Sequence, residues 1–129
     1  MLNDPLANVL SYISNHEKLG RKEIQVQNNS KVIKKVLEIL NTHHYVGSYT
    51  EVENGRGHVL AINLLGTINK VGVIKPRFNV QKDNYEKFEK RYLPAKDFGI
   101  LIVSTSKGMM THTDAKALGI GGRLVAYCY

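Results

Sequence analysis

Four consecutive apolar residues, Ile100–Val103, place the strongest constraint on how this chain can fold. A short, continuous apolar run is typical of a strand that is buried on both faces, so we expect residues 100–105 to form a central strand. The run ends abruptly in the sequence STSKG, residues 104–108. Folding needs alone do not explain three hydroxyl groups, a lysine and a glycine at the end of a buried strand, and we therefore expect a functional loop here.

The first half of the chain has the pattern helix, strand, helix, strand, strand. Asp4 and Pro5 suit the start of a helix, because Asp accepts a backbone hydrogen bond there and Pro lacks an N–H that would be unpaired. Gly20 is expected to end this helix. The periodic apolar residues of the two predicted helices are Leu6, Val9, Leu10 and Ile13, then Val32, Ile33, Val36, Leu37 and Leu40. Strands are expected at 22–26, 45–53 and 58–64, with turns at 28–30 and at 54–57 (NGRG).

The second half has the pattern of a small β-rich unit with short helices. Strands are expected at 71–74, 100–105 and 124–129, with 77–81 as a candidate continuation of the sheet and a polar helix at 83–92. Thr111 and Asp114 resemble the cap of a short helix that Gly119 ends. The fold class is α/β (α+β). We predict two small packed subdomains, residues 1–66 and 67–129.

Basic residues are concentrated in the second half. The chain has 18 Lys and Arg against 11 Asp and Glu, a net charge of +7. Residues 1–64 contain seven basic and six acidic side chains, whereas residues 65–129 contain eleven and five. This balance is compatible with a polyanionic partner such as nucleic acid. Because the apolar runs are only of strand length and the N-terminal residues lack the pattern of a signal peptide, we expect no membrane association.

A catalytic site or a metal site fits the sequence less well than binding of a nucleic acid does. A small hydrolase would use Ser104 or Ser106 as nucleophile and His112 as base. The serines lack the flanking glycines of a G-x-S-x-G elbow, and Asp114, the candidate orienting acid, is explained by the helix cap. The histidines are not spaced as metal ligands, and the single cysteine is expected to be a core residue. Residues 119–122 (GIGG) lack the lysine of a P-loop and predict a tight turn. We therefore expect no enzyme activity, metal or other cofactor.

Binding to structured RNA explains residues 104–108 better than a catalytic or metal site does. Hydroxyl groups both donate and accept hydrogen bonds, Lys107 supplies a cation for phosphate, and Gly108 lets a ligand approach the backbone. Such a loop suits an unstacked base, whose edges and 2′-hydroxyl are polar. Further candidate contacts are the cations Lys75, Arg77 and Arg123 and the helix starts at Asn3, Asp4, Ser30 and Lys31.

Two segments of the chain resemble a universal family, the small-subunit ribosomal protein eight family. Residues 4–15 (DPLANVLSYISN) look like its N-terminal helix motif. Residues 103–129 (VSTSKGMMTHTDAKALGIGGRLVAYCY) are similar to its C-terminal pattern nearly throughout. Residues 91–103 (RYLPAKDFGILIV) resemble the archaeal and eukaryotic members. The similarity extends over the whole chain.

The resemblance implies a structural constituent of the small ribosomal subunit, located in the cytoplasmic ribosome. Family members are primary rRNA-binding proteins, which bind an irregular helix in the central domain of small-subunit rRNA and help that domain to assemble. Other small-subunit ribosomal proteins are implied as partners, and we expect a monomer outside the ribosome. Together with Lys75 and Arg77, the RNA contacts expected in this chain are Asn3, Asp4, Ser30, Lys31, Ser104, Thr105, Ser106, Lys107, Gly108, Gly122 and Arg123.

Two further functions stay open beside this interpretation. Some bacterial relatives repress translation by binding an mRNA that mimics the rRNA site, and a general RNA chaperone would bind without a unique site. Bacterial relatives also carry an acidic residue where Arg123 stands, so we expect this residue to contact a phosphate.

Overall fold

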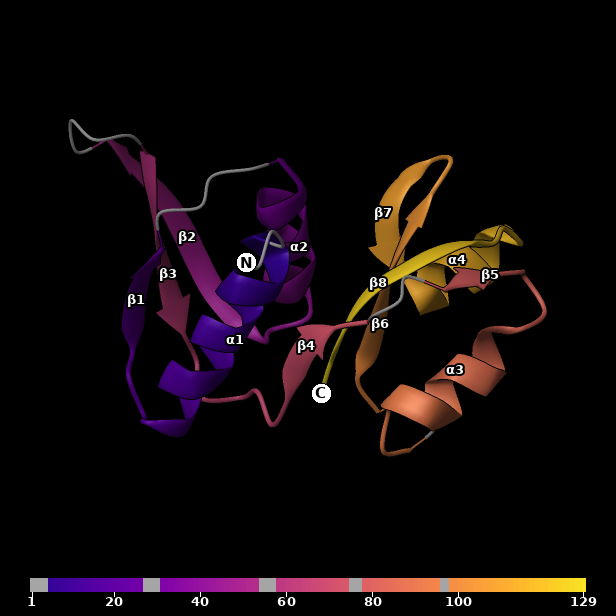
Figure 1. Cartoon of the computed structure of the whole chain (residues 1–129), viewed down its shortest axis with the longest axis horizontal. Helices are drawn as coiled ribbons and strands as arrows, with labels where there is room; N and C mark the ends of the chain where they lie inside the picture. Colours follow the sequence, from indigo (N-terminus) through magenta and orange to yellow (C-terminus); the bar gives the residue numbers. More distant parts are fainter. Residues whose placement is uncertain (1–4, 27–30, 54–57, 75–77, 96–97) are drawn as a thin grey trace. The chain divides into compact units, whose positions relative to one another are not determined.

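The computed structural model describes residues 5–26, 31–53, 58–74, 78–95 and 98–129. Within these residues the chain has four helices and eight strands in antiparallel sheets, which confirms the α+β class. It divides into two compact units, Met1–Asn69 and Lys70–Tyr129 (Figure 1). None of the helices in these ranges combines the length and the apolar character needed to cross a membrane.

The first unit has the predicted order of elements. These are α1 (Pro5–Lys18), β1 (Glu23–Val26), α2 (Lys31–Thr42), β2 (Val46–Glu53) and β3 (His58–Leu64). The strands form an antiparallel sheet in the order β1-β3-β2, with α1 against β1 and α2 against β2. The turns expected at 28–30 and 54–57 and the expected N-cap Asp4 lie outside the described residues.

The apolar stripes of both helices form the core of this unit. All four predicted α1 residues are buried, and so are the predicted α2 residues other than Val32, which is 41% exposed. Val32 is the second residue of α2 and lies in the first turn of the helix. Val32 therefore shares the apolar periodicity of α2 but does not belong to the core.

The second unit is built on one antiparallel sheet. Its elements are β4 (Val71–Val73), β5 (Asn79–Val80), α3 (Tyr85–Tyr92), β6 (Ile100–Thr105), β7 (Gly108–Thr111), α4 (His112–Leu118) and β8 (Gly122–Cys128). The strand order is β4-β8-β6-β7, and β5 pairs with β8. Strand β6 is internal and its first four residues are buried, which confirms the expected central strand. Strand β7 was not predicted, because its four residues GMMT begin with glycine and contain only one residue that favours strands, Thr111.

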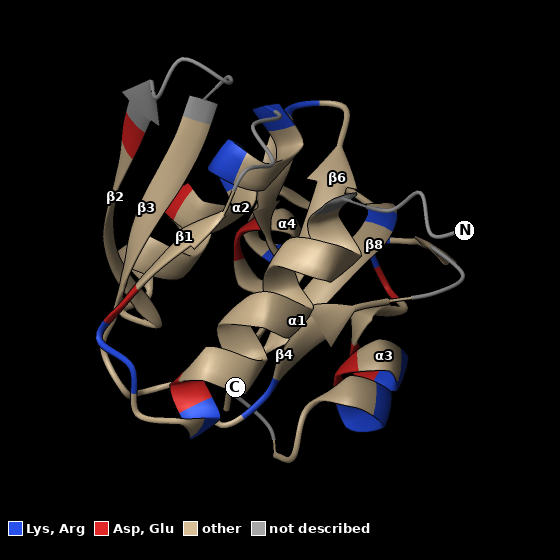
Figure 2. Cartoon of the chain, turned by 60° about the vertical axis from the view of Figure 1, so that its left-hand side comes forward, with Lys and Arg blue, Asp and Glu red and all other residues tan. Residues whose placement is uncertain are grey.

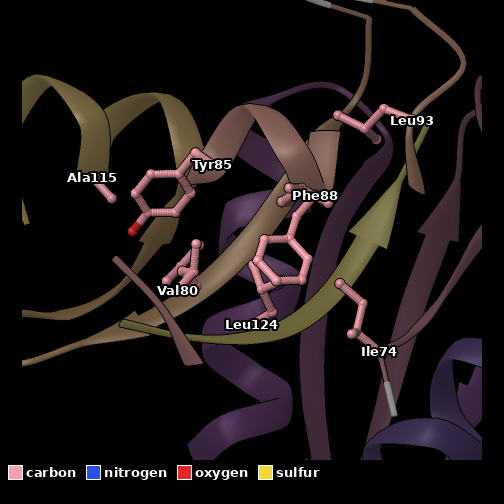
Figure 3. Packing of buried hydrophobic residues seen from close by; sticks show 9 residues of the cluster. Ile74, Val80, Tyr85, Phe88, Leu93, Ala115 and Leu124 are labelled. Atoms are coloured by element: carbon pink, nitrogen blue, oxygen red, sulfur yellow. The ribbon is translucent and has the colours of Figure 1, made fainter. Parts of the chain in front are cut away.

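Helix α3 covers one face of this sheet (Figure 3). Tyr85 and Phe88, three residues apart on α3, pack with sheet residues such as Val80 and Leu124. The Tyr85 hydroxyl donates a hydrogen bond to the carbonyl oxygen of Ile120 at 3.0 Å. Burial raises the pKa of the Tyr85 phenol. This side chain therefore links α3 to the segment between α4 and β8.

We predict that Tyr85→Phe lowers the free energy of unfolding by about 1 kcal/mol at neutral pH, because it leaves the Ile120 carbonyl without this partner. The raised pKa means that the folded state retains the phenol proton at pH values where the unfolded state releases it. The stability that Tyr85 contributes is thus lost as the pH rises above 10, and the difference between the two proteins should shrink there. Urea unfolding at pH 7 and pH 10.5 measures both effects.

Tyr12→Phe is the matched control, because Tyr12 is 42% exposed on α1. It should change the free energy of unfolding by less than about 0.5 kcal/mol. Equal stability of the wild-type protein and Tyr85→Phe at neutral pH would show that this hydrogen bond does not hold α3.

Candidate nucleic-acid interface

The sequence STSKG forms the turn of the β6–β7 hairpin. Thr105 pairs with Gly108 in the last register position of the hairpin, so Ser106 and Lys107 are the two residues at its tip. The Thr105 hydroxyl donates to the Gly108 carbonyl oxygen at 2.7 Å and accepts from the Lys107 N–H at 3.1 Å. Gly108 has a φ of 109°, a conformation that side chains disfavour.

Thr105 and Gly108 therefore have folding roles, and the expectation that folding needs leave the whole stretch unexplained was wrong for these two residues. The side chains that remain for a ligand are those of Ser104, Ser106 and Lys107, which are exposed.

A polar row crosses the sheet beside this turn. Ser104 of β6 pairs with Arg123 of β8, and Arg123 pairs with Asn79 of β5. Residues that lie directly opposite each other in a sheet share a face, so these three exposed side chains form one row. The Arg123 Nε donates to the Asn79 Oδ1 at 3.3 Å. Residues 77–81 were expected as a candidate continuation of the sheet, but Asn79 was missed as a site residue because Arg123 lies far from it in the chain.

Gly122 lets β8 approach the end of β6. A Cβ atom at Gly122 would collide with the carbonyl oxygen of Ser104 and lie 2.8 Å from Cγ1 of Val103. A Cβ atom at Gly121 would collide with the carbonyl oxygen of Val80. Together with Gly119, whose φ is 69° at the end of α4, these glycines form the tight turn that the sequence predicts. Gly122 thus positions the polar row.

The structure brings together only part of the predicted contact set. Ser104, Ser106, Lys107, Gly122 and Arg123 lie at one end of the second sheet. In the first unit, the exposed Lys31 begins α2. The remaining predicted contacts, Asn3, Asp4, Ser30, Lys75 and Arg77, lie outside the described residues.

His112, the base of the hydrolase alternative, has a structural position. Its side chain is buried, its Nδ1 accepts a hydrogen bond from the Leu101 N–H at 3.0 Å, and its Nε2 lies 3.3 Å from Glu89 Oε1. Lys116 pairs with the same Glu89 oxygen. This arrangement leaves neither ring nitrogen free to take a proton from Ser104 or Ser106. No sequence signal links Glu89 to His112, because the two residues are far apart in the chain.

The other features of the expected site have structural explanations as well. The Asp114 N–H donates to the Thr111 hydroxyl at 3.3 Å, which confirms the predicted helix cap. Cys128 is buried, as expected of a core residue. Within the described ranges, no three His, Cys, Asp or Glu side chains gather as metal ligands would.

Comparison with protein families matches residues 4–129 of the chain to the family described as Ribosomal protein S8. The match spans both compact units and includes the hairpin turn and the polar row.

We predict that Gly122→Ala lowers the free energy of unfolding by about 1–3 kcal/mol, the usual cost of overpacking, because backbone atoms of β6 occupy the space that its Cβ needs. Gly72→Ala is the matched control. Gly72 also pairs with β8, but its Cβ would meet only the side chain of Tyr127, with the hydroxyl oxygen at 3.1 Å. This variant should lose less than about 1 kcal/mol. Equal losses in chemical denaturation would contradict the proposed close approach at Gly122.

Proposed function

The chain belongs to the ribosomal protein S8 family, and from this premise we propose that its β6–β7 hairpin recognises small-subunit rRNA. A member of this family is a structural protein of the small ribosomal subunit that binds rRNA, so the chain acts in translation, in the cytoplasmic ribosome. We propose that the RNA site is an irregular helix in the central domain of small-subunit rRNA. By binding there, the protein promotes the assembly of that domain. Outside the ribosome the chain acts as a monomer.

The observation that carries this proposal is the exposed hydroxyl and cationic groups at the hairpin tip. Ser106 and Lys107 are the two residues of a turn whose backbone is fixed by the Thr105 hydroxyl. A fixed turn presents hydrogen-bonding groups in one geometry, which favours the irregular base arrangement of a distorted helix over regular duplex RNA. Ser106 contacts a base or a 2′-hydroxyl, and Lys107 contacts a phosphate.

The polar row extends this contact along the sheet. Arg123 uses its Nε for Asn79, which orients the guanidinium while its other N–H groups remain available to a phosphate. Ser104 lies opposite Arg123 and supplies a hydroxyl on the same face. Asn3, Asp4, Ser30 and Lys31 provide contacts from the first half of the chain, and Lys75 and Arg77 provide further phosphate contacts.

We predict that Ser106→Ala weakens binding of the central-domain rRNA fragment by about 1–3 kcal/mol, because a buried RNA group loses its hydrogen-bond partner. Filter binding or calorimetry at one fixed salt concentration measures this loss. Thr113→Ala removes another exposed hydroxyl of the second unit and should leave the affinity unchanged. Unchanged affinity of Ser106→Ala would refute base recognition by the turn. Equal affinity for bulk tRNA would instead favour a general RNA chaperone.

For Lys107→Ala we predict a shallower salt dependence of rRNA affinity, by about one unit in the log–log slope, because one phosphate contact releases its counterions. Lys90→Ala is the control. Lys90 lies on α3 and pairs with Glu86 at 3.6 Å, and its removal should preserve the slope. If the slope of Lys107→Ala equals that of the wild-type protein, Lys107 lies outside the interface.

A further inference from the structure

Four aromatic side chains form a continuous row on the second unit. Tyr92, at the end of α3, stacks on Tyr127 with ring centroids 5.6 Å apart. Tyr127 stacks on Tyr129 at 6.4 Å, and Tyr129 meets Phe98 at 6.4 Å. The row therefore joins α3, the end of β8 and the segment that precedes β6.

The aromatic rings of this row are only partly covered by the rest of the unit. Tyr92, Tyr127 and Tyr129 pack against the core of this unit but are only partly buried, and Phe98 is 49% exposed. Gly72 lies opposite Tyr127 in β4, and the absence of a side chain there leaves room for the tyrosine ring. Packing against the core thus explains the position of one side of the row. It does not explain the exposed ring of Phe98, whose apolar surface is in contact with water.

Two cations, Arg91 and Lys70, flank the row. The Arg91 guanidinium lies 5.0 Å from the ring centroid of Phe78 and 5.5 Å from that of Tyr92. At the other end, Lys70 exchanges two backbone hydrogen bonds of 2.9 Å with Tyr129. Among the described residues, neither Arg91 nor Lys70 has an acidic partner.

Two other cations of this region are paired, while Lys87 lies 5.8 Å from the ring centroid of Phe88, outside the row. Lys90 pairs with Glu86, and Lys116 pairs with Glu89. Figure 2 shows both signs of charge on α3. Arg91 and Lys70 therefore place positive charge that is unpaired within the described residues beside the aromatic rings.

We propose that this row, Tyr92, Tyr127, Tyr129 and Phe98 with Arg91 and Lys70, is a second RNA contact that binds unpaired nucleotides. Aromatic rings and arginine planes stack on bases of any sequence, and nearby cations hold the backbone. An acidic polypeptide would satisfy the cations but would not use the exposed ring face. The charge and the ring chemistry together therefore favour single-stranded RNA.

This contact goes beyond the function proposed for the hairpin. Tyr127 lies opposite Leu101 of β6, whereas the hairpin turn begins after Thr105. Four residues of antiparallel strand separate the two positions by about 14 Å. The two surfaces can therefore be tested independently in the same chain.

The first test uses a tryptophan at the exposed end of the row. The chain contains no tryptophan, so Phe98→Trp provides a single fluorescent reporter. We expect a twelve-nucleotide oligoadenylate to quench this fluorescence, and an abasic oligomer of equal charge to quench it at least about fivefold less effectively, because stacking needs bases. Equal quenching by the two oligomers would reduce the contact to charge alone and overturn the proposal. Quenching by a polyglutamate peptide alone would indicate a protein-binding surface and also overturn it.

The second test measures the affinity of a labelled oligoadenylate by fluorescence anisotropy. Phe98→Ala and Arg91→Gln should each weaken binding at least about fivefold, the lower end of the loss found for a stacking partner. Leu118→Ala, which shortens an apolar side chain that is 51% exposed on α4, and Lys90→Gln, which removes a paired cation, should have no effect. Far-UV circular dichroism verifies that each variant is folded. Unchanged affinity in both row variants would overturn the proposal.

Lys107→Ala separates this inference from the hairpin function. It should weaken binding of the structured rRNA fragment and leave oligoadenylate binding unchanged. If the hairpin variants leave rRNA binding unchanged while the row variants weaken oligoadenylate binding, the function proposed for the hairpin fails and the row contact stands. The opposite result refutes the row contact and leaves the hairpin function standing.

Discussion

The pairing of β6 with β8 is the interaction on which the second unit depends. Its register runs from Ile100 opposite Cys128 to Ser104 opposite Arg123, with a bulge between Ile102 and Val103. The bulge leaves Val125 outside the β6 register, and the Val125 carbonyl oxygen accepts from the Ile74 N–H at 3.0 Å instead. Leu101, Val103, Leu124 and Tyr127 can consequently pack with the same core cluster under α3. A one-residue slip would reverse the faces of these side chains and separate Ser104 from Arg123.

A polar cluster, in which Glu89 and His112 are buried and Lys116 is exposed, holds the helices onto this sheet. Glu89 of α3, His112 of α4 and Lys116 of α4 are linked through one carboxylate, and the Leu101 N–H completes the hydrogen bonds of the histidine. Burying charges costs free energy that attraction offsets only when the remaining hydrogen bonds are satisfied. The cluster is therefore better understood as a device for orientation than as a large source of stability. It places the end of α3, and with it Tyr92, beside β8.

The sequence predicts the parts of this fold that depend on local pattern. The apolar stripe of α1, the buried run of β6 and the Thr111 cap all follow from periodicity or capping chemistry within a few residues. What it missed depends on pairing between segments, either across the short β6–β7 turn or between residues far apart in the chain. Strand β7 exists because β6 offers it a partner, Asn79 joins the polar row through β8, and Glu89 meets His112 only after α3 packs. The assignment of residues 104–108 to RNA contacts remains a prediction, although the turn geometry already assigns Thr105 and Gly108 to the fold.

The two proposed RNA surfaces differ in the source of their binding free energy. Hydroxyl groups on a fixed hairpin discriminate, because a mispositioned base leaves a polar group unpaired. Aromatic rings and unpaired cations add affinity with little discrimination, because every base has a face that stacks. Both surfaces depend on the same β6–β8 pairing, with the hairpin at one end and Tyr127 near the other. A rigid strand between them fixes their separation, so an RNA that satisfies both must present an irregular helix and an unpaired segment at a set distance. The fold would thereby select an RNA shape as well as local base contacts.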